Sequence, residues 1–320
     1  MLEVKSVKKT LGKKEVLKGI DLLINEGEFI ALLGESGSGK TTLLRCIAGL
    51  EILNAGTVLF EEEKVIGPEG RLVPGHKSIE IVKQDFDLFA NHNIFDLLEF
   101  KLRGYDDEFI TTKIAELLNI MGISGFARKY LYEISGGEHQ RVAIAQALAG
   151  EPSVLLFDES FSHLDSRNTR MLFKEVTRLI KEMKISVLFA THQTELALAY
   201  ADKIAVMKSG EIVQIGEPRE IYDAPVNIYV AELFGEINLI DTELIEKRSS
   251  KKMFGLRPEN VLINIGDGLL CELLDQRYVG GRYRSELKLK SGSVLVAYHN
   301  EEIETNEVKI SFDQNKILEL

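Results

Sequence analysis

Short apolar runs alternate with helix-periodic segments through the first two thirds of the chain. The runs at 29–33, 154–157 and 185–190 hold mostly Val, Ile, Leu, Phe and Ala. Unbroken runs of this length are typical of buried parallel strands. Residues 2–25 instead alternate and turn as an antiparallel strand pair does, and the pattern from about 85 to 150 is helical. We therefore expect an α/β core with an antiparallel β subdomain and a helical subdomain.

The pattern changes after residue 235. Short alternating segments separated by Gly-rich turns predict strands at 260–265, 269–278, 282–290, 294–298, 308–312 and 316–320. This alternation predicts a small C-terminal β-barrel. A chain of 320 residues is also too long for one ordinary core. We therefore predict two domains, at 1–235 and 236–320.

A phosphate-binding loop is the strongest motif in the sequence. Residues 34–41 match G-x-x-x-x-G-K-[ST] at every fixed position, between a predicted strand and a predicted helix. Glycines let backbone N–H groups face phosphate oxygens, and the helix N-terminus adds about half a positive charge. Lys40 should reach the β- and γ-phosphates, and the Thr41 hydroxyl should reach Mg²⁺. The predicted nucleotide-binding residues are Gly34, Glu35, Ser36, Gly37, Ser38, Gly39, Lys40, Thr41 and Thr42.

Polar residues follow three predicted strands. The strand at 154–157 ends in Asp158 and Glu159, at the sheet edge where ligands bind in such folds. We expect Asp158 to bind Mg²⁺ through its water shell, and Glu159 to take a proton from the attacking water if it lies within about 3 Å. Helix capping by either acid is the alternative. Gln84 and His192 also follow strands, and each taken alone is more often a solvated or structural residue.

A second glycine-containing helix start precedes the helical run at 142–149. Ser135 is placed as an N-cap, and the amides of Gly136 and Gly137 follow it. The pattern predicts either a second anion site or an ordinary helix cap.

Composition narrows the function classes. The net charge of -11 and the pI near 5.2 argue against nucleic-acid binding, which usually requires a basic face. No run approaches the roughly 18 apolar residues of a membrane span, and the N-terminus lacks the apolar core of a signal peptide. The two cysteines, Cys46 and Cys271, are expected to be buried free thiols. We expect a cytoplasmic protein with no nucleic-acid partner.

These motifs, in this order, resemble those of an ABC transporter ATPase. The resemblance covers residues 1 to about 235 and implies a P-loop NTPase fold with a RecA-like core. The Walker A motif corresponds to residues 34–41 and the Walker B motif to residues 154–159. The Q-loop corresponds to Gln84 and the signature to residues 135–141. The D-loop corresponds to residues 162–165, with Asp165 at its end, and the H-loop to Thr191-His192.

The resemblance also implies a mechanism. The family forms head-to-tail homodimers that hold two MgATP, and Ser135 and Gly137 of one subunit would contact the γ-phosphate held by the other. ATP-driven closure and reopening after hydrolysis would drive transport. The implied catalytic residues are Glu159, His192 and Gln84. The implied metal site consists of Thr41, Gln84 and Asp158, the last through water.

The partners implied by the resemblance are membrane proteins. Permease subunits would dock near residues 85–103, so the chain would lie at the cytoplasmic face of the cell membrane. A solute-binding protein would take part indirectly, and the sequence leaves the transported solute open. A soluble ABC ATPase of DNA repair or translation, or an export ATPase, is the alternative to an importer subunit.

The C-terminal region resembles the TOBE, or OB-like, domain of importer ATPases of the polyamine, iron(III), sulfate and molybdate groups. The likeness lies in residues 225–231 and 254–261 and rests mainly on Arg257-Pro258-Glu259. A stabilising or dimerising appendage without a ligand is the alternative.

Two features depart from the family pattern. Leu11 stands where the family usually places an aromatic residue that stacks on adenine, so base stacking should be weaker or supplied otherwise. The signature has Ile134 and Glu138-His139 where Leu and Gln-Gln are commoner. We expect the second change to be tolerated because the serine and both glycines are intact.

Overall fold

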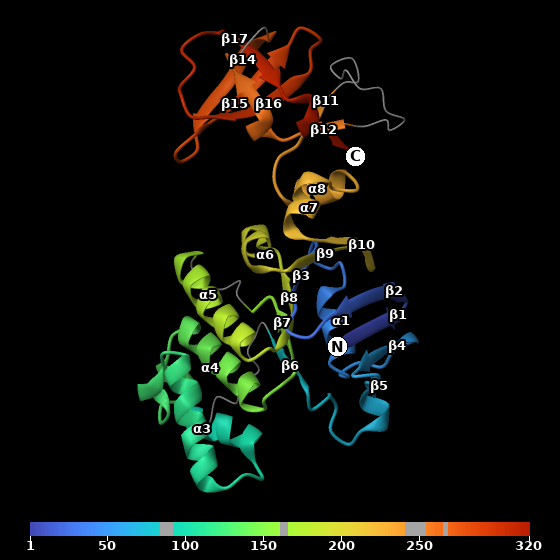
Figure 1. Ribbon diagram of the computed structural model, residues 1–320, viewed down its shortest axis with the longest axis vertical. Helices are drawn as coiled ribbons and strands as arrows, with labels where there is room; N and C mark the ends of the chain where they lie inside the picture. The colour runs from blue at the N-terminus through green and yellow to red at the C-terminus, as the bar shows by residue number, and fades with distance from the viewer. Residues whose placement is uncertain (84–91, 161–165, 241–253, 265–267) are drawn as a thin grey trace. The chain divides into compact units, whose positions relative to one another are not determined.

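A computed structural model describes residues 1–83, 92–160, 166–240, 254–264 and 268–320 (Figure 1). The predicted sites at Gln84 and Asp165, and residues 85–91 of the expected docking segment, lie outside the described residues. The chain divides into two compact units, Met1–Pro218 and Arg219–Leu320. This division falls ahead of the domain boundary placed at 235 from the sequence. Among the described residues, no helix is both long and apolar enough to cross a membrane.

A six-stranded sheet forms the centre of the first unit. Its order is β10-β9-β3-β8-β7-β6, parallel except for β10, which pairs antiparallel with β9. The strands are β3 (Phe29–Leu33), β6 (Ile79–Val82), β7 (Val154–Asp158), β8 (Ser186–Thr191), β9 (Lys203–Lys208) and β10 (Glu211–Gly216). In a parallel sheet all carboxyl ends meet at one edge, so β3, β7 and β8 deliver their following residues to the same place.

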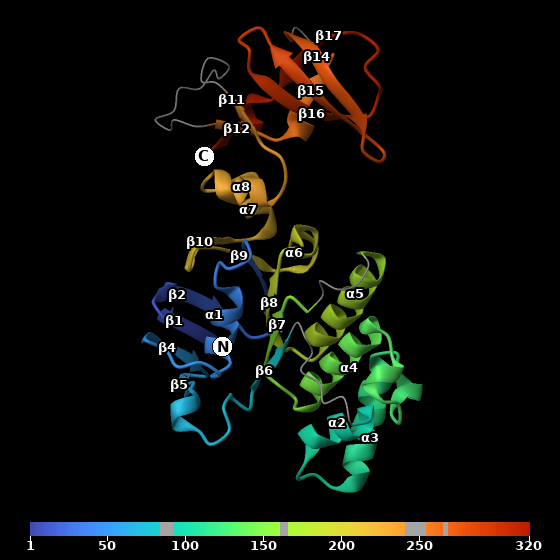
Figure 2. The same cartoon turned by 180° about the vertical axis from the view of Figure 1, so that it is seen from behind.

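Helices cover both faces of this sheet, as the opposite views in Figures 1 and 2 show. Successive side chains of β3 point to opposite faces. Ile30 and Leu32 therefore join the apolar cluster around α1 (Lys40–Ile47), whereas Phe29 packs edge-on against Phe173 of α5 (Ser166–Glu182), 5.9 Å between ring centroids. Another helix, α6 (Thr194–Tyr200), contacts β3 and α5. Burial on both faces explains why these strands read as unbroken apolar runs.

The predicted N-terminal strand pair is confirmed and belongs to a four-stranded antiparallel sheet. Its order is β2-β1-β4-β5, with β1 (Leu2–Leu11), β2 (Lys14–Ile24), β4 (Ala55–Phe60) and β5 (Glu63–Lys64). The inward face of this sheet shares one apolar cluster with α1, which includes the predicted buried thiol of Cys46. The hairpin of β1 and β2 is thereby packed beside the helix that follows the phosphate-binding loop.

The region predicted to be helical contains α2 (Ile94–Glu99), α3 (Asp107–Ile120) and α4 (Gly136–Ala149). The Asn93 and Asp106 side chains cap α2 and α3 by accepting N–H bonds from Asp96 and Phe109. The predicted apolar face of α3 is buried, at Ile114, Leu117, Leu118 and Met121.

The second unit is built on a nearly closed β-barrel, as the alternating pattern predicted. A five-stranded antiparallel sheet has the order β13-β17-β14-β15-β16, and its edge strands β13 and β16 contact each other. These strands are β13 (Val261–Ile263), β14 (Leu269–Tyr278), β15 (Tyr283–Leu289), β16 (Val294–His299) and β17 (Glu307–Phe312). A three-stranded sheet of β11 (Asn238–Ile240), β12 (Phe254–Leu256) and β18 (Leu318–Glu319) completes the core, which encloses the Cys271 thiol.

Two short helices, α7 (Pro218–Asp223) and α8 (Ile228–Leu233), are fastened to this barrel by Arg257. Its buried guanidinium donates through Nη1 to the carbonyl of Ala231 at 2.8 Å and stacks on the ring of Tyr222, 4.3 Å from the centroid. The Tyr222 hydroxyl in turn donates to Glu259. The Arg257-Pro258-Glu259 motif therefore has a structural role in this unit.

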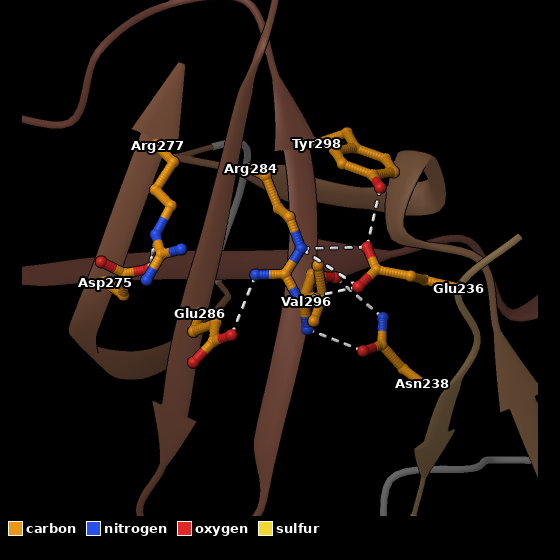
Figure 3. Close-up of polar contacts among 8 residues, drawn as sticks. All are labelled: Glu236, Asn238, Asp275, Arg277, Arg284, Glu286, Val296 and Tyr298. Atoms are coloured by element: carbon orange, nitrogen blue, oxygen red, sulfur yellow. Dashed lines mark hydrogen bonds and ion pairs between the residues drawn. The ribbon is translucent and has the colours of Figure 1, made fainter. Parts of the chain in front are cut away.

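A second arginine anchors the segment that follows α8, as Figure 3 shows. Arg284 donates to both carboxylate oxygens of Glu236, at 2.7 to 3.1 Å, and to Glu286 at 2.9 Å. The bonds from Arg284, with that from Tyr298, hold the pKa of Glu236 below its ordinary value. The Asn238 side chain pairs with the backbone N–H and C=O of Val296 at 2.7 and 2.8 Å. This pairing satisfies backbone groups of the edge strand β16, which would otherwise be open to association.

Candidate nucleotide-binding site

The phosphate-binding loop lies between β3 and α1, as predicted, and two of its glycines are required by close contacts. Gly34 has φ 157°, and a Cβ there would lie 2.3 Å from the carbonyl oxygen of Met207. Gly39 has φ 110°, and its Cβ would lie 3.0 Å from the carbonyl oxygen of Val16. Any larger residue would push the loop away from β9 and β2. These contacts fix the loop against both neighbouring strands.

Lys40 is enclosed by this loop and only 5% exposed. Its Nζ donates to the carbonyls of Gly34 at 2.8 Å and Glu35 at 3.0 Å, and lies 3.4 Å from Glu159 Oε1. The buried Ser38 Oγ has no hydrogen-bond partner within the described part of the chain. A buried polar group without a partner costs about 1–3 kcal/mol, so this hydroxyl suits a polar ligand in the loop.

The two motifs that were predicted to bind metal meet directly. The Thr41 hydroxyl donates to Asp158 Oδ1 at 2.8 Å. Burial raises the pKa of the Asp158 carboxyl, and the neighbouring Glu159 raises it further, while the Thr41 bond and Lys40 oppose the shift. A cation beside this carboxylate would favour its charged form for the same electrostatic reason.

The described residues contain no cluster of three or more His, Cys, Asp or Glu side chains that could hold a metal. Thr41 and Asp158 offer one hydroxyl and one carboxylate, both hard oxygen ligands. Mg²⁺ keeps several waters and binds through one or two protein oxygens together with substrate phosphates. These two residues therefore fit Mg²⁺ bound with a nucleotide.

Glu159 occupies a strained backbone position at the end of β7. Its φ is 48°, and its N–H donates to the carbonyl of Ala190 in β8 at 3.1 Å. The next residue, Ser160, donates its hydroxyl to the Val82 carbonyl of β6 at 2.7 Å. A non-glycine residue in the left-handed region costs about 1–3 kcal/mol and is found disproportionately at functional sites. Bonds to both neighbouring strands hold this turn in place.

His192 follows β8 and lies beside Glu159. Its Nδ1 is 3.8 Å from Glu159 Oε2, and its side chain is 60% exposed. The sheet therefore brings together five of the predicted site residues: Lys40, Thr41, Asp158, Glu159 and His192.

The predicted signature lies at the start of α4, in the helical region. The Ser135 backbone N–H and hydroxyl both donate to Glu138 Oε2 at 2.7 Å. These bonds lower the pKa of the Glu138 carboxyl. Ser135 and Gly136 are exposed, and His139 contacts the Leu131 carbonyl. Glu138 stands where glutamine is commoner and completes a capping interaction, while Ser135 and Gly136 stay exposed and Gly137 is half-buried.

Sequence reasoning missed the contribution of β9 to the loop. The Met207 carbonyl packs against Gly34, and the Gly210 N–H donates to the carbonyl of Ser38 at 2.9 Å. The apolar run at 204–207 was the available signal for this strand.

Leu11 ends β1 and is 46% exposed. Leu11→Tyr is expected to tighten ATP binding by about 1 kcal/mol, because an aromatic ring would offer adenine a stacking surface. Calorimetric titration with ATP would measure the change. Leu23→Tyr, at an equally exposed leucine of β2, is the matched control and should leave the affinity unchanged. An unchanged affinity in Leu11→Tyr would show that this residue does not face the base.

The chain is similar to known proteins of one family. A family model described as ABC transporter matches residues 17–162. The spermidine/putrescine import ATP-binding protein PotA of Haemophilus influenzae is 34% identical over 96% of this chain and 78% of its own length. The PotA protein of Thermotoga maritima is 33% identical over 93% of this chain and 89% of its own.

Solved structures give the same result. The cbiO1 protein of Clostridium perfringens, part of an ABC transporter complex, matches with a TM-score of 0.62 at 30% identity, over 69% of this chain and 89% of its own. The dimeric bacterial ABC transporter cassette MJ0796 matches with a TM-score of 0.61 at 31% identity, over 68% and 99%. The resemblance inferred from the motifs is confirmed, and the chain belongs to the ABC transporter ATPases, among the importer ATP-binding proteins.

Proposed function

We propose that this importer ATPase holds MgATP with its phosphates in the loop at residues 34–41 and hydrolyses it with the residues that follow β7 and β8. The hydrogen bond between Thr41 and Asp158, 2.8 Å long, carries the proposal, because it joins the phosphate-binding loop to the acidic strand end. Lys40, now bonded to loop carbonyls, is within reach of a phosphate oxygen that enters the loop. Its charge would then be balanced by the triphosphate.

Mg²⁺, when bound, neutralises charge that develops on the transferring phosphoryl group and orients the phosphates. Thr41 would contact it directly and Asp158 through water. Glu159 would accept the proton of the attacking water, and His192, whose Nδ1 lies 3.8 Å from Glu159 Oε2, would offer a second polar group beside that water. The bond from the Glu159 N–H to the Ala190 carbonyl holds the backbone of this residue, and its Oε1 lies 3.4 Å from Lys40 Nζ, so the proposed base stands beside the loop. Gln84 completes the proposed set.

The active form would be a head-to-tail homodimer. Ser135, Gly136 and Gly137 are placed at an accessible helix start, where backbone N–H groups favour an anion. Ser135 and Gly137 of one subunit would bind the γ-phosphate held by the loop of the other. The similar MJ0796 cassette is dimeric in its solved structure, which supports a dimer as the active form.

Permease subunits would dock in a groove of the first unit. This groove has a volume of about 610 Å³ and runs between β6, the loop at 71–77 and the helical region. Phe100, which is exposed, and Lys101 line it, and Lys101 pairs with Glu80 at 2.6 Å. Phe100 and Lys101 belong to the predicted docking segment at 85–103. Docking here would place the chain at the cytoplasmic face of the membrane, with a solute-binding protein acting through the permease.

The similarity to spermidine/putrescine import proteins favours polyamines as the transported solute class. Uptake of labelled polyamine by cells with and without the subunit tests this assignment. The alternatives of a soluble DNA-repair or translation factor are not favoured, because the relatives are import proteins.

Co-purification from membranes tests the importer function. The wild-type chain should be recovered with its permease subunits, and Phe100→Ala should weaken that association by about 2 kcal/mol, the usual scale for truncating a central aromatic contact. Phe109→Ala is the matched control, because Phe109 is also exposed but stacks on Tyr105 outside the groove. Recovery of wild type without any membrane protein would refute the importer assignment, and equal losses in both variants would refute the groove.

A further inference from the structure

Lys9 of β1 is a buried lysine outside the phosphate-binding loop. Only 8% of the surface of Lys9 is exposed. The Nζ donates to the carbonyl of Ile52 at 2.8 Å and lies 3.0 Å from Glu51 Oε2. Burying an ammonium group is unfavourable unless it is paired and hydrogen-bonded. The folded chain therefore needs both contacts to keep Lys9 in this place.

Glu51 links this lysine to the helix of the nucleotide site. Arg45, in the last turn of α1, donates through Nε to Glu51 Oε1 at 3.0 Å. Burial would raise the pKa of Glu51, but the bonds from Lys9 and Arg45 outweigh it and lower the pKa. The carboxylate is therefore held between β1 and the helix that begins at Lys40.

A second tie runs beside the first. The Thr10 N–H donates to Asn54 Oδ1 at 2.7 Å, and the Asn54 N–H donates to the carbonyl of Lys8 at 3.0 Å. Three consecutive residues of β1, at 8–10, are thus bonded to the segment that follows α1. The next residue is Leu11, at the end of the strand.

These bonds supply a restraint that packing cannot. The apolar cluster shared by β1, β2 and α1 presses the sheet against the helix, but apolar contact is non-directional and allows small shifts. Hydrogen bonds have strict distances and angles and therefore fix the strand along its axis. The hairpin that they hold also carries Val16, whose carbonyl abuts Gly39 of the phosphate-binding loop.

We infer that Lys9 is a positioning residue, and this inference rests on the nucleotide site proposed above. Through Glu51, Lys9 fixes the position of the end of the β1–β2 hairpin relative to the phosphate-binding loop. It thereby controls affinity for the base and ribose end of the nucleotide without touching it. The phosphate end is bound by the loop at 34–41, which Met207 and Gly210 also hold from the side of β9. The two ends of the ligand should therefore respond differently when Lys9 is removed.

The experiment compares ATP with inorganic tripolyphosphate, which has the phosphate end only. Dissociation constants are measured by calorimetry for wild type and Lys9→Met, which keeps most of the side-chain volume. The dissociation constant for ATP should rise about tenfold, which is slightly less than the usual contribution of one hydrogen bond to a charged group. The dissociation constant for tripolyphosphate should stay within about twofold of the wild-type value. Lys113→Met is the matched control, because Lys113 is 16% exposed and pairs with Glu151 at 2.7 Å in the helical region. It should change neither constant.

If Lys9→Met weakened the binding of ATP and of tripolyphosphate equally, the role of Lys9 would be merely structural. If neither affinity changed, the hairpin would not need this tie. Either result overturns the inference. If Lys9→Met does not fold, Asn54→Ala removes only the neighbouring tie and should weaken ATP about threefold with tripolyphosphate unchanged. A wild-type protein that binds neither ligand would refute the proposed nucleotide site itself. Wild-type affinities that are equal for both ligands would refute only the role of the hairpin.

Discussion

Glu159→Gln is expected to bind ATP normally but to hydrolyse it about 10²-fold more slowly or worse, the usual scale for losing a positioned base. Glutamine keeps the size and hydrogen-bonding reach of the side chain and removes the proton acceptor. Because hydrolysis would reopen the closed dimer, the variant should accumulate as an ATP-bound dimer. Phosphate release and light scattering with MgATP measure the two effects.

Asp158→Asn is the matched comparison, since it changes the adjacent acid in the same way. Asp158 accepts the Thr41 hydroxyl, so its loss should raise the Mg²⁺ concentration for half-maximal activity by about 10- to 100-fold, the range for groups that act on a metal indirectly. Little stable dimer should form. A Glu159→Gln protein that stays monomeric and hydrolyses ATP at the wild-type rate would show that the base lies elsewhere.

Lys40→Ala is expected to lower kcat/KM for ATP by about 10²- to 10³-fold, the range for deleting one charge-stabilising donor. The ammonium is enclosed by the loop, where Nζ already reaches the Gly34 and Glu35 carbonyls. Without it, no side-chain cation of the loop faces the triphosphate, because 34–41 contains no other lysine or arginine. ATP titration and phosphate release measure binding and turnover separately.

Lys181→Ala is the control for this substitution. Lys181 pairs with Asp202 at 3.2 Å on the surface, so its removal should leave ATP binding and hydrolysis near wild type. Thermal unfolding of both variants separates a local defect from a general loss of stability. Wild-type hydrolysis by Lys40→Ala would contradict the nucleotide site on which the proposed function rests.

Much of the fold could be predicted because its signals are local. The runs at 29–33 and 154–157 are unbroken because both faces of β3 and β7 are buried, and the alternation after residue 235 reflects a barrel with one buried face. The strand β9 was missed although its apolar run resembles the others. The predicted boundary put residues 219–235 in the first domain, whereas α7 and α8 contact Arg257 and belong to the second compact unit.

In the nucleotide site, too, some features have a local signal in the sequence and others have none. The motif at 34–41 predicts both the conformation of its backbone and the class of its ligand. Glycine, lysine and threonine at this spacing before a helix are specific for a phosphate-binding loop. The strain at Glu159 and the anchoring of its turn by Ala190 and Val82 have no signature in the sequence. They depend on which strands become neighbours in the sheet.

The sequence by itself determined the ligand class, the order of the motifs and the two-part fold, because each is encoded by residues close together in the chain. Tertiary structure alone decided that Thr41 meets Asp158 across more than a hundred residues, and that Lys9 is buried against Glu51. Such pairs arise only when separate segments pack. Their strength comes from burial, where a hydrogen bond to a charged group is worth about 1.5–3 kcal/mol and an unpaired charge is unfavourable.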